Sequence, residues 1–154
     1  MFKRYSFLFI FSLMLLPALQ AFDANETLSY LGATISEIFE YPVIPEEIYP
    51  NRGIEEDEDN VIFYYSNGFY LFLFENRVWQ VRYDRNYKEA ILDLKMENTM
   101  VQILADKLEE GITPLFSGDN YLTFQIAESP YPVRMKLFFT DDKLDDLYIF
   151  RADF

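Results

Sequence analysis

The sequence predicts an α+β fold made of two tandem units, residues about 22–84 and about 85–154, that share one sheet. Each unit consists of a short helix followed by an antiparallel meander of three or four strands. Three features support this fold: strand-like runs of β-branched and aromatic residues, two helix-start signatures, and the same order of both in each half. The chain has 154 residues, which is a usual length for one domain.

Residues 1–21 have the layout of a secretory signal peptide. The basic residues Lys3 and Arg4 precede an uncharged apolar run, and Ala21 is a small residue at the expected cleavage point. Cleavage there leaves residues 22–154 as a single α+β domain. The alternative is an uncleaved N-terminal membrane anchor, since the apolar run is close to the shortest length that spans a bilayer.

The first meander is expected between residues 61 and 83. The strand-like runs 61–66, 69–74 and 77–83 are separated by Asn67-Gly68 and Glu75-Asn76. Asn-Gly favours a two-residue hairpin turn. The region therefore predicts three antiparallel strands joined by two tight turns.

The second meander is expected in the last quarter of the chain. Residues 121–127, 133–140 and 144–152 have strand-like composition, and Asp141-Asp142-Lys143 is a turn candidate between the last two. Three strands follow from this pattern.

Each meander follows a predicted helix. Thr34 with Glu37, and Thr99 with Gln102, form capping boxes that satisfy free backbone donors at a helix start. A further short helix is expected over residues 26–31.

The two halves share these landmarks in the same order. The capping box at Thr34 is matched at Thr99, Asn60 is matched by Asn120, and Arg82 is matched by Arg151. This order indicates a tandem repeat. The alternative is an ordinary meander whose halves are alike only in composition.

At the level of architecture the chain resembles β-lactamase inhibitor proteins, and its single unit resembles the outer-membrane assembly lipoprotein SmpA. The segment Gly32-Ala33-Thr34 is similar to the Gly-x-Thr start of the helix in those families. The second unit departs from them, with Glu97-Asn98-Thr99 at the same place, and the inhibitor family's disulfides are missing. The resemblance implies a protein-binding role for the sheet face and no enzyme activity.

Two-residue turns would set which side chains share a face of the sheet. Tyr64 would then face Leu71, and Phe63 would face Phe72. One face would be almost wholly apolar and buried under the helices: Phe63, Tyr65, Tyr70, Phe72, Phe74, Trp79, Val81 and Tyr83. The other would mix apolar and basic residues, and three-residue turns would reverse these assignments.

The mixed face is the candidate binding site. An apolar centre with arginines nearby is typical of protein interfaces. The alternative is a solvated sheet face whose cations pair with nearby carboxylates. The candidate binding residues are Tyr64, Leu71, Gln80, Arg82, Gln125, Arg134, Lys136 and Arg151.

Composition excludes several function classes. The chain has no Cys and no His, so thiol chemistry, histidine acid–base catalysis and zinc sites built on these residues are absent. Its 26 acidic against 13 basic residues, a net charge of −13, disfavour nucleic acid as a partner. The acidic run 55–59 lacks the spacing of a calcium loop. No metal or cofactor is expected.

The sequence therefore predicts an exported, periplasmic or extracellular protein that is not an enzyme. Its expected partner is a protein of the cell envelope, or another extended polar ligand, docked on the mixed face of the sheet. The alternatives are a membrane-anchored or outer-membrane envelope protein and a hydrolase that uses two carboxylates. No pair of carboxylates can be singled out for the hydrolase.

Overall fold

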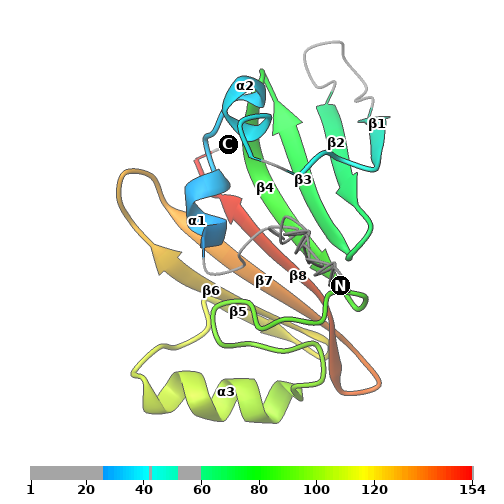
Figure 1. Ribbon diagram of the computed structural model, residues 1–154. Coiled ribbons are helices and arrows are strands. Elements are labelled where there is room, and N and C mark those ends of the chain that lie inside the picture. The colour runs from blue at the N-terminus through cyan, green and yellow to red at the C-terminus, as the bar shows by residue number, and fades with distance from the viewer. Residues whose placement is uncertain (1–25, 42, 52–59, 154) are drawn as a thin grey trace, which may run out of the picture.

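The computed structural model describes residues 26–41, 43–51 and 60–153, which form one antiparallel eight-stranded sheet with three helices (Figure 1). The strand order is β1-β2-β3-β4-β8-β7-β6-β5. In chain order the elements are α1 (Thr27–Tyr30), α2 (Ile35–Ile38), β1 (Glu47–Asn51), β2 (Asn60–Tyr65), β3 (Phe69–Phe74), β4 (Arg77–Asp84), α3 (Met100–Glu109), β5 (Phe116–Gly118), β6 (Tyr121–Ala127), β7 (Val133–Thr140) and β8 (Lys143–Arg151). The predicted α+β class with an antiparallel sheet is confirmed.

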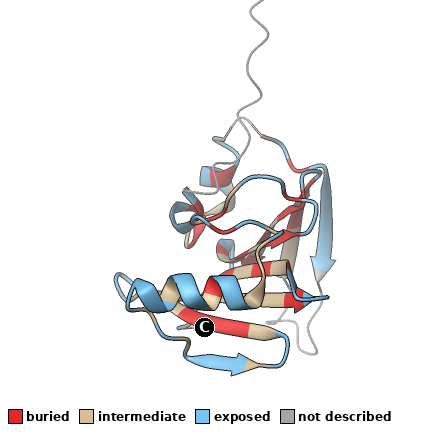
Figure 2. Cartoon of the chain, turned by 90° about the horizontal axis from the view of Figure 1, so that it is seen from below, coloured by how far each residue is buried: buried red, intermediate tan, exposed pale blue. Residues whose placement is uncertain are grey.

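The hydrophobic core lies between the three helices and one face of the sheet (Figure 1, Figure 2). Ile38 of α2 and Ile103 of α3 are buried in it. The hydroxyls of Thr27 in α1 and Tyr83 in β4 form a hydrogen bond of 2.6 Å. Each large apolar side chain buried here stabilises the fold by roughly 1.5–3 kcal/mol.

The first turn of the meander has three residues rather than the expected two. Tyr65 lies opposite Phe69, so residues 66–68 form the turn. A shift of one residue moves every side chain of a strand to the other face. Leu71 is therefore buried in the core, whereas Phe72 lies on the opposite face, and the predicted faces of β3 are wrong.

The next hairpin turn along the chain, and the one between β7 and β8, have two residues. Glu75 and Asn76 join β3 to β4, and Asp141 and Asp142 join β7 to β8. All four have positive φ, as the twist of a two-residue hairpin turn requires. Both turn predictions are confirmed, although Lys143 already belongs to β8.

Both predicted capping boxes are present. The Thr34 amide donates to the Glu37 carboxylate at 2.7 Å, and the Thr99 amide donates to the Gln102 side-chain oxygen at 2.9 Å. They begin α2, which is one turn long, and α3, which has ten residues. The helix expected over residues 26–31 is α1.

The strands β1 and β5 were not predicted individually. They are the two edges of the sheet. Pro50 in β1 suits an edge strand because proline cannot donate a ladder hydrogen bond, and β5 has only three residues. These short, polar-flanked segments carry little alternation from which a strand could be recognised.

The predicted signal segment 1–21 and the acidic run 55–59 lie outside the described residues. Within the described part of the chain, the helices are all too short or too polar to cross a bilayer.

Candidate functional site

The sheet face turned away from the helices, here called the open face, carries two rows of side chains that run across the strands. The register places the first row as Glu47, Tyr64, Tyr70, Arg82, Tyr148, Lys136, Thr123 and Phe116. It places the second row as Tyr49, Ile62, Phe72, Gln80, Phe150, Arg134 and Gln125. All three described helices pack on the other side of the sheet.

The rows bring together six of the eight residues predicted from the sequence. These are Tyr64, Gln80, Arg82, Gln125, Arg134 and Lys136. They lie on four different strands, β2, β4, β6 and β7, and are all partly exposed. β8 pairs with both β4 and β7, so one strand separates the two halves of this set.

The other two predicted residues, Leu71 and Arg151, do not lie on the open face. Leu71 is fully buried in the core because of the three-residue turn. Arg151 follows Leu147 and Ile149 on the helix side of β8, where its guanidinium lies 4.1 Å from the ring centroid of Tyr131. The prediction that Leu71 and Arg151 lie on the mixed face is therefore wrong.

At the centre of the first row, Arg82 is held by one carboxylate and two aromatic rings. Its Nε donates to Asp146 Oδ1 at 2.7 Å, and its Nη2 lies 2.6 Å from the same oxygen. The guanidinium carbon lies 4.9 Å from the ring centroid of Tyr70 and 5.5 Å from that of Tyr148. Burial acts to lower the pKa of Arg82, but the hydrogen bond and charge of Asp146 outweigh it and hold that pKa above its ordinary value.

Burial also raises the pKa of the Asp146 carboxyl, and Arg82 works against this rise. The pair is thus partly removed from water, which strengthens its charge-assisted hydrogen bonds. The arrangement fixes the position of the Arg82 guanidinium plane between the two tyrosine rings.

Tyr70 and Asp84 form a second polar contact at the end of β4. The Tyr70 hydroxyl donates to Asp84 Oδ2 at 2.9 Å, and the Asn86 amide donates to Asp84 Oδ1 at 2.8 Å. Burial, followed by the hydrogen bond and charge of Asp84, raises the pKa of Tyr70 to about 12. The buried carboxylate is therefore satisfied by local donors.

Sequence reasoning missed the aromatic residues of the open face in β3 and β8. The two-residue turn predicts Tyr70 and Phe72 on the buried face, and the predicted site does not include Tyr148 and Phe150. A three-residue first turn is the signal that would have placed Tyr70 and Phe72 correctly. Nothing local in the sequence marks the face of Tyr148, because apolar residues occupy both faces of β8.

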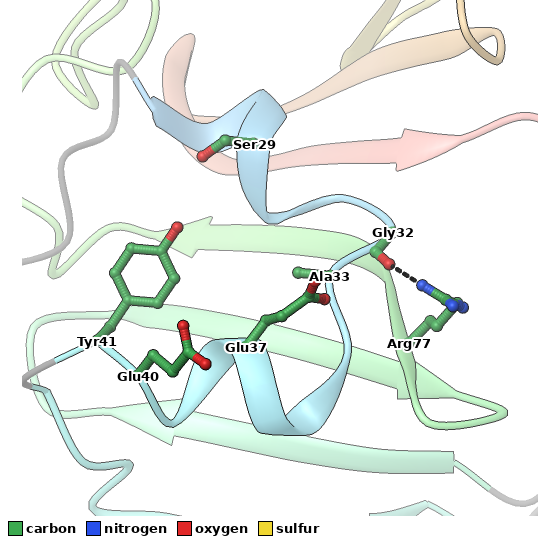
Figure 3. Close-up of a pocket in the computed structure, with 7 residues that line it drawn as sticks. All are labelled: Ser29, Gly32, Ala33, Glu37, Glu40, Tyr41 and Arg77. Atoms are coloured by element: carbon green, nitrogen blue, oxygen red, sulfur yellow. Dashed lines mark hydrogen bonds between the residues drawn. The ribbon is translucent and has the colours of Figure 1, made fainter.

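A separate cavity of about 590 Å³ lies on the helix side (Figure 3). It is lined by Ser29, Gly32, Ala33, Glu37, Glu40, Tyr41 and Arg77. Arg77 Nη1 donates to the Gly32 carbonyl at 2.8 Å. The backbone and hydroxyl hydrogen bonds of Thr34 lower the pKa of Glu37. These groups hold the start of α2 against the beginning of β4, so their observed contacts are structural.

Residues 26–41, 43–51 and 60–153 contain no group of three or more acidic side chains that could hold a metal ion. Comparison with protein-family models, with curated proteins and with solved structures found no match. The resemblance to the β-lactamase inhibitor proteins and to SmpA stays a prediction.

Proposed function

We propose that the protein is an exported, non-enzymatic binding protein of the cell envelope that docks a protein partner on the open face. The observation that carries this proposal is the pair of side-chain rows across the open face. They combine tyrosine and phenylalanine with arginine, the residue types that dominate binding energy at protein interfaces. The proposed export rests on the signal-peptide layout of residues 1–21.

The pattern of packing on the two faces supports docking rather than simple solvation. On the core face, alternate residues of β2, β3, β7 and β8 are buried, whereas the aromatic side chains of the open face remain partly exposed. Phe116 and Tyr49, at opposite ends of the rows, are 57% and 43% exposed. A broad exposed surface of this composition is typical of an interaction site.

We further propose that the sheet is assembled from two similar units. Thr34 bridges to Arg77 at the start of β4, and Thr99 bridges to Lys143 at the start of β8. In each case the strand follows a two-residue turn with positive φ. This matching of helix start, turn and strand start supports the duplication, but it aligns Arg82 with Tyr148 rather than with Arg151.

Capture of envelope proteins tests the docking proposal. The wild-type protein is compared with a Tyr64→Ala, Tyr148→Ala double variant, which removes two aromatic side chains from the open face. A Val101→Ala, Leu108→Ala variant is the matched control, because both side chains are exposed on α3 at 71% and 50%. Near-ultraviolet circular dichroism checks that each variant is folded.

We expect a partner that the wild type and the control capture equally and that the tyrosine variant loses. Equal capture by all three would place any binding elsewhere and contradict the proposal. N-terminal sequencing of the protein recovered from its host tests export separately, since cleavage after Ala21 would leave Phe22 as the first residue.

A further inference from the structure

The part of the open face formed by β6 and β7 carries no acidic residue, although the protein is strongly acidic. The chain has 26 acidic residues and a net charge of −13, yet β6 and β7 contain no Asp or Glu. The carboxylates of Asp84, Asp145 and Asp146 gather at one end of β4 and β8. Two of these three already pair with arginines, Asp146 with Arg82 and Asp145 with Arg85.

Arg134 and Lys136 stand apart from this cluster, on the acid-free strand β7. Neither has a carboxylate within salt-bridge distance among the described residues. The Lys136 ammonium lies 5.0 Å from the ring centroid of Tyr121 and 4.7 Å from that of Phe138. Arg134 Nε donates a hydrogen bond to the Gln125 side-chain oxygen at 3.5 Å, which is long for such a bond.

We propose that the partner contributes an acidic protein segment whose carboxylates pair with Arg134 and Lys136. This inference rests on the proposed function and adds the chemistry of the partner. Lys136 lies near two aromatic rings, and Arg134 lies opposite Phe150 in the register of β7 and β8. Neither cation has a carboxylate partner among the described residues, so together they form a site that is complementary to carboxylates. The flanking rings of Tyr121, Phe138 and Phe150 would exclude water from the pairs and strengthen them.

The spacing of the two cations fits an extended segment. Arg134 and Lys136 are two residues apart on one strand, so their Cα atoms are separated by about 6.6 Å. An extended peptide has the same spacing between alternate residues. Asp or Glu at positions i and i+2 would therefore meet both cations from one side.

The overall charge favours a short acidic segment over other anions. Nucleic acid and an anionic membrane surface are large anions, so they would meet the acidic parts of the protein as well as the open face. The net charge of −13 therefore repels them. A segment of a few residues meets the local charge of the open face, because charges farther away than about 8 Å are screened at physiological salt.

A subtractive peptide selection with the full chain tests this proposal. Randomised twelve-residue peptides displayed on phage are captured on the wild type and then depleted on an Arg134→Met, Lys136→Met variant. Methionine keeps an unbranched apolar side chain and removes the charge. A Lys88→Met, Lys95→Met variant is the control, because it removes the same charge from exposed lysines in the segment between β4 and α3.

We expect the peptides that depend on Arg134 and Lys136 to contain Asp or Glu at i and i+2 at least threefold more often than the library does. Depletion on the control should leave no such peptides. Fluorescence of Trp79, the one tryptophan of the chain, should report dissociation constants that rise at least tenfold between low and high salt, because screening weakens ion pairs. Trp79 is a suitable reporter since it contacts Phe72 of the open face.

Three outcomes would overturn the inference. A subtracted pool without acidic enrichment would show that Arg134 and Lys136 do not select carboxylates. The same enrichment after depletion on the control would show a general charge effect. Peptides that are lost from the Tyr64→Ala, Tyr148→Ala variant but do not depend on charge would refute the acidic partner and leave the proposed function standing.

Discussion

Arg82 and Tyr148 lie directly opposite each other on the two central strands, β4 and β8. The pairing is symmetric about them, because Gln80 faces Phe150 on one side and Asp84 faces Asp146 on the other. Arg82 reaches across to Asp146 in the neighbouring strand and covers the ring of Tyr148. The two halves of the sheet are thus joined at the centre of the open face by a charged contact as well as by backbone hydrogen bonds.

This contact predicts a measurable coupling between Arg82 and Asp146. In a double-mutant cycle with Arg82→Met and Asp146→Asn, we expect a coupling energy of about 1–2 kcal/mol, because the hydrogen bonds are charge-assisted and partly buried. The free energy of unfolding is measured in urea for the wild type and the three variants. Additive effects of the two substitutions would contradict the prediction.

Leu71 distinguishes the core from the open face. Replacement by Ala should lower the free energy of unfolding by about 2–5 kcal/mol, as is usual for a fully buried leucine. The control is Ile48→Ala on the edge strand β1, where the side chain is 56% exposed, and there we expect a loss below about 1 kcal/mol. If Leu71→Ala left the stability unchanged, its position in the core would be wrong.

The placement of Leu71 also shows where the sequence was informative. Hydrophobic alternation and turn residues predicted β2, β3, β4, β6, β7 and β8 within a residue or two. The faces of β2 and most of β4 were correct. Those of β3 were reversed because Asn-Gly favours a two-residue turn, whereas Ser66 joins Asn67 and Gly68 in the actual turn. One residue in a loop therefore decided the orientation of a whole strand.

The faces of β8 were beyond local reasoning for a different reason. Tyr148 and Phe150 on one side alternate with Leu147 and Ile149 on the other, so both sides are apolar. The choice is made by the pairing of β8 with β4, a contact between residues more than 60 positions apart. Because both sides of β8 are apolar, the prediction for Arg151 fell on the wrong face. The predictions for Arg134 and Lys136 were correct because β7 has a clearly apolar side.

Gly68 predicts a strong local constraint on the three-residue turn. It has φ of 82°, and a Cβ there would lie 2.3 Å from Asp84 Oδ1 and 2.9 Å from the Tyr87 amide nitrogen. Gly111 is a matched control: its φ is 79°, and a Cβ added there would meet no atom within 4 Å. Both Ala variants carry the backbone cost of a positive φ, about 1–2 kcal/mol, but only Gly68→Ala adds a steric clash.

We therefore expect Gly68→Ala to lower the free energy of unfolding by clearly more than Gly111→Ala, by about 2 kcal/mol or more. Urea denaturation of both variants under the same conditions measures the difference. Equal losses would show that Asp84 and the backbone at Tyr87 move aside without cost.

Tyr70 predicts a loss of stability at alkaline pH. Its pKa is raised to about 12 in the folded protein, whereas an unfolded tyrosine titrates near 10. Because the folded state favours the neutral phenol, this contribution is fully present below pH 10 and is lost as the pH rises towards 12. Burial also raises the pKa of Tyr65, so the wild type should lose stability from both residues over this range.

The Tyr70→Phe variant separates the two contributions. Below pH 9 it should be less stable than the wild type by about 1 kcal/mol, because the hydrogen bond to Asp84 is missing. Between pH 10 and 12 its free energy of unfolding should fall less steeply, so that the two curves converge. Urea denaturation at several pH values measures both curves, and the ultraviolet absorbance of tyrosinate reports the missing titration directly. Parallel curves over this range would mean that Tyr70 titrates alike in the folded and unfolded states, and the hydrogen bond to Asp84 would then have no influence on its proton.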